Sequence, residues 1–267
     1  MNDRHTGESL ERQTPRAAHE AMRDLQADVR LRRDRGPDRG DAAPAWPAVA
    51  SVQAVDAAAV ERTVILLPQP RTAGSIADVM QQRVSVRHFA REPVALDQIA
   101  AVLKAAAAGD AREWPLESAR PLQLRLLAWR VSGLPAGVYS YGGERHVLRF
   151  DGPAPDPVVD GPDLTLQPEF AEAPFILFIT GNLAAALRAH GSAGYPQLLL
   201  RGGSAGQRAW LAAIGAALCG VTFAGFLPAA ASHYLGANGY EACCLLAFAG
   251  GRPADNGSTP VTARVPL

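Results

Sequence analysis

Three polar side chains, spaced two residues apart, stand out in the first half of the chain. Arg83, Ser85 and Arg87 alternate with Val84 and Val86 in the segment QRVSVRHF. If the segment is extended, side chains two residues apart point to the same side, so two guanidinium groups flank a hydroxyl group. This arrangement suits a phosphate or another planar, electron-rich group. The alternative is a solvated, arginine-rich turn before the next helix.

The overall composition excludes several classes of protein. The chain has 267 residues, 48% of them hydrophobic, which is enough for a sizeable core in one large or two small domains. Its 26 basic and 26 acidic residues balance, so charge gives no case for binding nucleic acid or an anionic membrane. No apolar run reaches the roughly 20 residues of a membrane-spanning helix, and the polar N-terminus carries no secretory signal. We therefore expect a cytoplasmic protein with no membrane or nucleic-acid partner.

The three cysteines, Cys219, Cys243 and Cys244, form neither a disulfide framework nor a metal-binding spacing. Adjacent residues of an extended segment point to opposite faces, so Cys243 and Cys244 are not arranged as a pair of ligands. We interpret all three as small core residues in a reducing compartment and predict no metal site.

Changes in composition divide the chain into four parts. Residues 1–13 are expected to be a disordered tail, and Thr14–Pro15 supplies a capping hydroxyl and a first-turn proline for a helix to about Arg33. This helix and an Ala-, Pro- and Gly-rich arm make up residues 14–62. Residues 63–256 form the main domain, and residues 257–267 form a C-terminal tail.

The main domain combines helical and strand-like segments. Helices are predicted from Ser75 to about Gln82 and over Leu96–Ala108, Ala184–His190 and Tyr195–Leu218. Short apolar or alternating runs predict strands at Thr63–Leu67, Leu122–Val131, Gly137–Tyr141, His146–Phe150, Phe175–Thr180 and Cys243–Ala249. The pattern predicts an α+β fold in which helices flank a central mixed or antiparallel sheet of about five strands.

The order of these pieces resembles the nitroreductase-type flavoprotein family from about His19 to Arg252. It is most similar to the SagB-like branch, which oxidises azolines in ribosomally made peptides. The matching elements, in chain order, are the early AHE element at 18–20, the strand at 64–68, QRVSVRHF, the GLPAGVYSY strand at 133–141, Ala173–Pro174 before FILFIT, GVTFAGF at 220–226 and the closing segment 246–252.

This resemblance implies a nitroreductase-like fold and an interlocked homodimer that binds FMN at the subunit interface. The residues it assigns to the FMN phosphate, ribityl chain and ring edge are Arg83, Ser85 and Arg87, with Arg252 as a second phosphate contact. It places backbone N–H groups of Ala224, Gly225 and Phe226 near flavin N5, where donors stabilise developing negative charge. A glycine at 225 lets the backbone approach the ring closely. An ordinary turn glycine is the alternative.

The sequence departs from the resemblance on the substrate side. Azoline-oxidising members carry a Lys-Tyr pair in a KYGxRGY segment, and here Ala189 and His190 occupy those positions. With an unperturbed pKa of ~6.5, His190 is a candidate general acid or base. The alternative is a histidine that meets the negative end of a helix dipole. Tyr195 is a candidate proton donor or a core aromatic residue. The loop over the flavin, WPLESARP at 114–121, keeps only the final proline of the family pattern.

Three functions follow from these patterns. The first is an FMN oxidoreductase that converts an azoline to an azole, performs a related desaturation, or reduces a modified peptide residue with NAD(P)H as electron donor. The second is a general NAD(P)H nitro or quinone reductase, which is disfavoured by the N-terminal helix and arm. The third is a non-catalytic subunit of a peptide-modifying complex. The first implies a peptide substrate and other peptide-modifying enzymes as partners.

Overall fold

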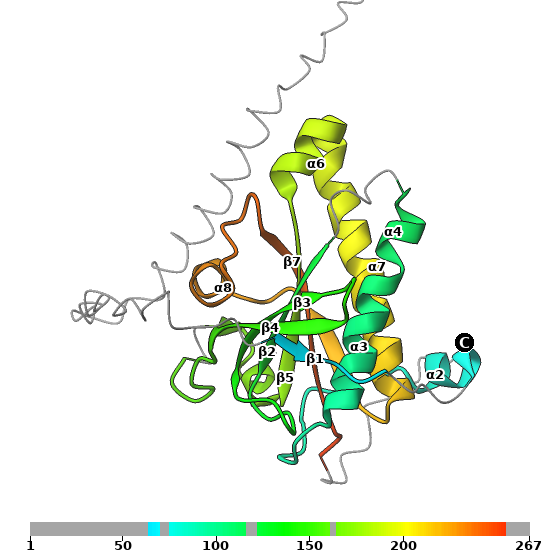
Figure 1. Ribbon diagram of the computed structural model, residues 1–267, viewed down its shortest axis with the longest axis vertical. Coiled ribbons are helices and arrows are strands. Elements are labelled where there is room, and N and C mark those ends of the chain that lie inside the picture. The colour runs from blue at the N-terminus through cyan, green and yellow to red at the C-terminus, as the bar shows by residue number, and fades with distance from the viewer. Residues whose placement is uncertain (1–63, 70–74, 116–121, 161–163, 255–267) are drawn as a thin grey trace, which may run out of the picture.

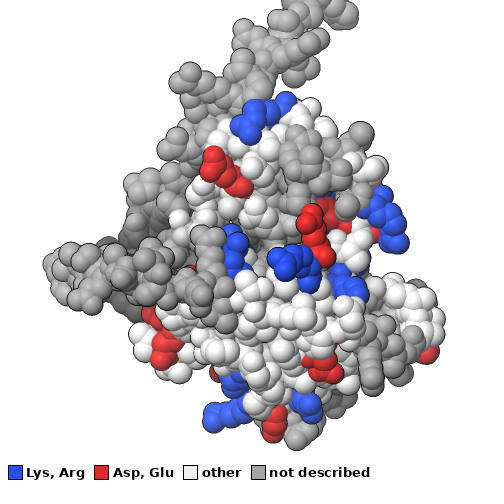
Figure 2. All heavy atoms as spheres, in the orientation of Figure 1, with Lys and Arg blue, Asp and Glu red and all other residues white. Residues whose placement is uncertain are grey.

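The computed structural model describes residues 64–69, 75–115, 122–160 and 164–254. The predicted N-terminal helix, the arm that follows it and the C-terminal tail lie outside these residues. The described chain has the predicted α+β composition, with helices packed against a single sheet (Figure 1). No helix in these residues is both long and apolar enough to cross a membrane. Acidic and basic side chains are interspersed among uncharged ones on the face shown in Figure 2.

The sheet has seven strands, where the sequence predicted about five. Every pair of neighbours is antiparallel, so the mixed alternative is not realised. Its order is β1-β4-β3-β2-β5-β7-β6. The strands are β1 (Val64–Leu66), β2 (Gln123–Ala128), β3 (Gly137–Gly142), β4 (Val147–Pro153), β5 (Phe175–Gly181), β6 (Cys219–Phe223) and β7 (Cys243–Gly251).

Strand β6 is the strand of this sheet that the sequence did not predict. It lies where the predicted long helix was expected to finish and a turn to begin. The helix ends three residues earlier, at Gly215, and Ala217 follows with φ 59°. Gly220 obscures the strand pattern, yet it is needed there, because a Cβ at this position would lie 2.6 Å from the Phe248 ring. A glycine in a strand interior commonly marks such a close approach.

Two sets of helices cover the two faces of the sheet. Helices α3 (Leu96–Ala108) and α7 (Gly194–Gly215) pack against each other on one face, as Figure 1 shows. The other face is covered by α8 (Pro228–Leu235) and the 3₁₀ helix η2 (Pro168–Glu172), whose Phe170 and Ala231 join the buried cluster. The alanine-rich α3 packs closely, because six of its residues are at most 2% exposed: Ile99, Ala100, Ala101, Val102, Leu103 and Ala106.

The remaining helices mark the two ends of α7. Helix α6 (Leu183–His190) and the 3₁₀ helix η3 (Gly191–Ala193) lead directly into its N-terminus. Helix α2 (Ile76–Gln82) begins after the N-cap Ser75, whose hydroxyl group accepts a hydrogen bond from the Asp78 N–H, and it contacts α7. Figure 1 shows α6 and α2 at opposite ends of α7. The short helix α4 (Asp110–Glu113) follows α3.

Candidate functional site

The segment from Arg83 to Arg87, which we call the clamp segment, is extended and lies at the surface. Arg83 caps the C-terminus of α2 with φ −71° and ψ 98°. Arg83, Ser85 and Arg87 are exposed, while Val84 and Val86 are half-buried. The predicted alternation of polar and apolar side chains is therefore confirmed, and the three polar groups are accessible to a ligand.

The clamp segment is fixed along the edge strand of the sheet. Ser85 forms a parallel bridge with Gly220 of β6, and the Val86 N–H donates to the Gly220 carbonyl at 3.1 Å. Downstream, the Ala90 N–H donates to the Arg252 carbonyl at 2.9 Å, which ties the segment to the end of β7. These backbone bonds give the clamp segment a defined position beside β6 and bring Arg252 into its neighbourhood.

The two clamp arginines differ in their partners. The Arg83 guanidinium carbon lies 4.8 Å from the ring centroid of Trp210 on α7, within the range of a cation–π contact. No carboxylate in the described part of the chain pairs with Arg83. Arg87 instead lies 4.0 Å from the Glu169 carboxylate of η2, in an exposed ion pair. Arg83 is thus the cation whose donors are more available to an anion.

Arg252 is exposed and follows the last strand directly. It lines a hollow of about 320 Å³ together with residues at the start of α3 and just past the end of α7, which are Ala95, Asp97, Gln98 and Ala216. The Gln98 side chain spans two of these elements by accepting from the Ala95 N–H at 3.0 Å and donating to the Ala216 carbonyl at 2.6 Å.

The turn at residues 224–226 follows β6 and pairs with the segment that leads into η2. The Leu166 N–H donates to the Gly225 carbonyl at 2.7 Å, and the Leu227 N–H donates to the Leu164 carbonyl at 3.0 Å. A Cβ at Gly225 would lie 3.1 Å from the Gln167 side-chain oxygen, so the glycine accommodates this neighbouring segment. The N–H groups of Ala224, Gly225 and Phe226 donate to no backbone carbonyl of the described residues.

The two residues predicted for proton transfer lie at the other end of α7. His190 is the last residue of α6, before Gly191 with φ 58°. Tyr195 is in the first turn of α7 and packs against a small apolar cluster that includes Leu187 and Cys243; burial raises the pKa of its hydroxyl group. Tyr195 and Trp210 are 15 residues apart on one helix, about 22 Å along its axis. The structure therefore does not bring Tyr195 or His190 to the clamp segment of the same chain.

Buried and half-buried thiols agree with the reading of the cysteines as core residues. Burial raises the pKa of Cys219 and of Cys243 to about 11, and it raises that of Cys244 as well. Thiols with such pKa values stay protonated near neutrality and are poor nucleophiles and ligands. Within the described residues, no three His, Cys, Asp or Glu side chains cluster closely enough to hold a metal ion.

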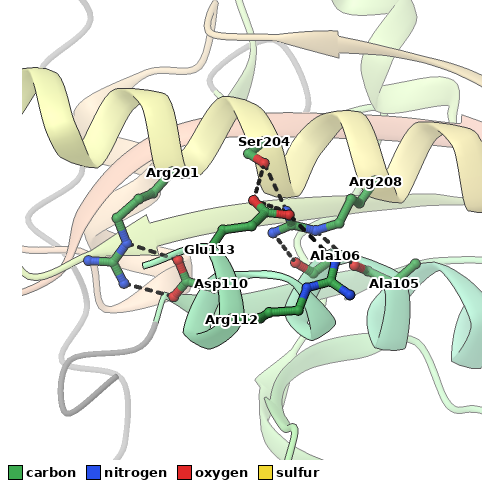
Figure 3. A network of polar contacts seen from close by, with 8 residues as sticks. All are labelled: Ala105, Ala106, Asp110, Arg112, Glu113, Arg201, Ser204 and Arg208. Carbon is green, nitrogen blue, oxygen red and sulfur yellow. Dashed lines mark hydrogen bonds and ion pairs between the residues drawn. The ribbon is translucent and has the colours of Figure 1, made fainter. Parts of the chain in front are cut away.

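A second group of arginines, on the N-terminal two thirds of α7, is paired with carboxylates of α4 (Figure 3). The Arg201 side chain, 2% exposed, donates to both carboxylate oxygens of Asp110, at 2.9 and 2.7 Å. Arg208 donates to Glu113 at 2.7 Å, and the Ser204 hydroxyl group donates to the same carboxylate at 2.8 Å. Asp110 also accepts from the Leu122 N–H at 3.0 Å. This network fixes α4 and the start of β2 on α7.

Trp210 and Glu169 were absent from the sequence-based site. Trp210 lies on a helix rich in Ala, Gly and Leu, so nothing in its local pattern distinguishes it from a core residue. Its role as the platform beneath Arg83 depends on α2 meeting the C-terminal half of α7, which is a tertiary contact. Glu169 reaches Arg87 across a distance of 82 residues in the chain.

Comparisons with known proteins identify the family to which this fold belongs. Residues 80–251 match the model of the nitroreductase family, from the end of α2 to the end of β7. The chain belongs to the nitroreductase family. No curated protein sequence matches it.

Solved structures show the same fold. One, from Anabaena variabilis, is named as a nitroreductase and has 25% sequence identity and a TM-score of 0.62; the match covers 72% of this chain but 42% of that one. Another named nitroreductase, from Ralstonia eutropha, has 21% identity and a TM-score of 0.54 over 72% of this chain and 90% of the other.

A chain of the E. coli microcin synthetase complex McbBCD, solved with truncated pro-MccB17 bound, covers more of this protein. It matches 87% of this chain and 94% of its own, with 17% identity and a TM-score of 0.51. At this level of identity the likeness concerns the fold. The predicted nitroreductase-like fold is therefore confirmed, with seven strands in place of about five.

Proposed function

We propose that this chain is a cytoplasmic FMN-dependent oxidoreductase that oxidises or reduces a modified residue in a ribosomally made peptide. The observation that carries the proposal is the Arg83 cation. It is exposed, stacked on a buried tryptophan and unpaired by any carboxylate of the described residues. A phosphate monoester is the natural partner for such a guanidinium group, because it offers several charged acceptors at once.

The neighbouring groups fit FMN in the order that the family resemblance implies. Ser85 supplies a hydroxyl group beside Arg83, and Arg87 lies one step further along the clamp segment. Arg252 is a further cation near the segment, through the bond between its carbonyl group and Ala90. The N–H groups of residues 224–226 have no backbone acceptor among the described residues, so they are available to flavin N5. We assign the phosphate to Arg83 and Arg252, and the ribityl chain and ring edge to Ser85 and Arg87.

When bound, FMN would supply a ring that accepts or releases hydride. The chain's own contribution is to hold the phosphate with fixed positive charge and to present backbone donors to the ring. Such donors stabilise the negative charge of the reduced ring without reorganising during the reaction.

The choice of a peptide substrate rests on the resemblance to the SagB-like branch. The fold likeness to a chain of a microcin synthetase complex, solved with a truncated precursor bound, is in keeping with that choice. Two directions of electron flow are open to such a site. In the oxidative direction an azoline would give up a hydride to the flavin and a proton to a base to become an azole, and oxygen would take up the two electrons. In the reductive direction NAD(P)H would supply the hydride, and an acid group or water the proton, that reduce a dehydroamino acid.

His190 and Tyr195 enter this proposal through a second copy of the chain. Since Tyr195 is about 22 Å along α7 from the residue that supports Arg83, neither side chain serves the clamp segment of its own subunit. In a homodimer with the flavin at the interface, the partner subunit can supply the proton-transfer group. We therefore propose a homodimer in which His190, and secondarily Tyr195, acts on substrate bound at the other subunit's flavin.

A non-catalytic role is the second candidate. Ala189 and His190 replace the Lys-Tyr pair of azoline-oxidising members, which favours a subunit that binds flavin or peptide without turnover. A general NAD(P)H nitro or quinone reductase is the third candidate, and turnover of nitro or quinone substrates with NAD(P)H but not of the peptide would favour it.

The experiment is to purify the protein and measure its flavin content by absorbance and mass spectrometry. We expect FMN bands that bleach with NAD(P)H or with peptide substrate, and loss of FMN in the Arg83→Ala, Arg87→Ala double variant. Stoichiometric FMN retained by that variant would refute the assignment of the site. A colourless wild-type protein that rejects added FMN would refute the proposed activity.

The role of His190 needs its own measurement. We expect His190→Ala to keep FMN and lose peptide turnover. Unchanged turnover at equal flavin content would remove His190 from the mechanism. Mixing the His190→Ala and Arg83→Ala chains tests the homodimer, because a mixed dimer retains one complete site and should recover part of the activity.

A further inference from the structure

Arg83 is held in place by an aromatic ring. Its guanidinium carbon lies 4.8 Å from the centroid of the Trp210 ring. In the described part of the chain it forms no ion pair, whereas Arg87 pairs with Glu169. An exposed arginine with no such contact samples many rotamers, and this freedom is lost when it binds a ligand. The Trp210 ring is therefore the feature that restricts where the Arg83 charge lies.

The Trp210 ring is itself buried in the core. Trp210 is 5% exposed and lies in the main core with Ala209 and Ala213. Its ring also packs against that of Phe248 in β7, at 6.4 Å between centroids. A ring packed in a dense core offers a well-defined surface to the cation above it.

The presence of a tryptophan at position 210, in place of a fully apolar aromatic residue, needs a physical reason. The indole Nε1 is buried and has no hydrogen-bond partner in the described residues, and a buried donor without a partner destabilises the folded state. Phenylalanine would fill an apolar site without this cost. Tryptophan, however, has the face that attracts a cation most strongly among the aromatic side chains. The choice of indole is explained by its contact with Arg83.

We propose that Trp210 is a positioning residue for the FMN phosphate, acting through Arg83. The inference rests on the proposed function, because it assigns the phosphate to the clamp. Trp210 itself does not touch the flavin in this proposal. It fixes the guanidinium group before the ligand arrives, so that binding orders fewer side-chain rotamers. The gain in affinity should concern the phosphate group of FMN, since the donors of Arg83 suit a phosphate oxyanion.

The test compares two ligands that differ only in that group, FMN and riboflavin. We expect Trp210→Leu to weaken FMN binding by about 3- to 30-fold, the range of a cation–π contact, and to change riboflavin binding by less than about twofold. Trp210→Phe keeps an aromatic face and should lose less FMN affinity than Trp210→Leu. If Trp210→Leu fails to fold, Trp210→Phe should still show a loss of affinity that is selective for FMN, smaller than the loss expected of Trp210→Leu.

A double-mutant cycle then shows whether Trp210 acts through Arg83. Arg83→Met should weaken FMN binding more than Trp210→Leu does, and adding Trp210→Leu to Arg83→Met should weaken it no further. Phe175→Leu is the control for loss of a buried aromatic residue, because Phe175 belongs to the same core and does not contact Arg83. It should lower the melting temperature without an FMN-selective loss of affinity.

The outcomes separate the two proposals. Wild-type protein that binds no FMN overturns the proposed function and this inference with it. Wild-type protein that binds FMN, with the Trp210 variants equal to it, overturns the inference alone. Equal losses for FMN and riboflavin, or additive losses in the cycle, also overturn it, since they would show a general effect of the core.

Discussion

Two groups of arginines around α7 have opposite surroundings. Where α7 contacts α4, Arg201 is buried and bonded to both oxygens of Asp110, and Arg208 is bonded to Glu113. Where α7 contacts α2, Arg83 is exposed and rests on Trp210 without a carboxylate partner among the described residues. Within the part of the chain that the structure describes, carboxylates neutralise the charges of Arg201 and Arg208, and none neutralises that of Arg83.

This difference separates structural arginines from binding arginines. A buried guanidinium group that loses its carboxylate remains as an uncompensated charge, so its pair is required for folding. An exposed guanidinium group is solvated by water, so the protein folds without a carboxylate partner for it. Its five donors then stay available to an anion. Substitutions in the two regions should therefore change different measurements.

The largest expected effect is on the buried pair. Asp110→Ala leaves Arg201 charged and buried, and we expect the free energy of unfolding to fall by about 3 to 5 kcal/mol. Urea unfolding followed by circular dichroism measures this change. Arg112→Ala on the same short helix is the control, because its side chain is 82% exposed. A loss below about 1 kcal/mol for Asp110→Ala would mean that the pair is not structural.

Arg83→Ala should leave the stability of the fold almost unchanged and weaken FMN binding. We expect the free energy of unfolding to change by less than about 0.5 kcal/mol, as for most exposed substitutions. FMN affinity, measured by fluorescence titration, should fall by about 10- to 100-fold, the value of a hydrogen bond to a charged group. Arg145→Ala, at another exposed position, should change neither quantity. If Arg83→Ala and Arg145→Ala bind FMN equally well, Arg83 is not a binding arginine and does not differ from Arg201 and Arg208 in this way.

Glu113 gives a smaller, pH-dependent effect. The Ser204 hydroxyl group and Arg208 lower the pKa of Glu113 below 4.5, against the opposing effect of burial. A lowered pKa in the folded state means that ionised Glu113 stabilises the protein above pH 4.5 and that this contribution disappears as the pH falls through the lower value. Because the side chain is 35% exposed, the contribution is below about 1 kcal/mol.

Unfolding of Glu113→Gln and wild type at several pH values measures this contribution. The two proteins should differ at neutral pH and converge as the pH falls through the lowered folded-state pKa of Glu113. A difference that stays constant over this range would assign the effect of the substitution to packing.

Removal of the Glu169 charge should give the smallest effect. Glu169→Gln frees Arg87 from an exposed pair with a 4.0 Å separation. If Arg87 contacts the flavin, FMN should bind about twofold more tightly, since exposed pairs contribute only a few tenths of a kcal/mol. A titration at low and high salt checks this gain, which screening should reduce. Weaker FMN binding in Glu169→Gln would mean that the ion pair supports the site.

Local patterns predicted the parts of the fold that depend on neighbouring residues. The alternation around Ser85, the bounds of α3 and the hairpin of β3 and β4 all follow from spacing and turn residues within a short window. The continuous apolar run of β5 predicted a buried strand, and all seven of its residues are buried. In the site, the exposure of the clamp segment was predictable in the same way.

Helix α8 was not predicted although its signals, Pro228 and Gly236, are local. Other features that the sequence did not predict are long-range. Strand β6 is defined by its pairing with β7, and Gly220 obscures its strand pattern. The contact between Arg83 and Trp210 joins residues 127 positions apart, and no local spacing marks it. The separation of Tyr195 from the clamp follows from the length of α7, which the sequence did predict, combined with the position of α2, which it did not.

The Asp110 carboxylate has one further consequence, for protein engineering. By binding both Arg201 and the backbone N–H of Leu122, it joins the middle of α7 to the residue that precedes β2. A tag or fluorescent reporter inserted next to Asp110 would displace both contacts at once and should therefore not be tolerated.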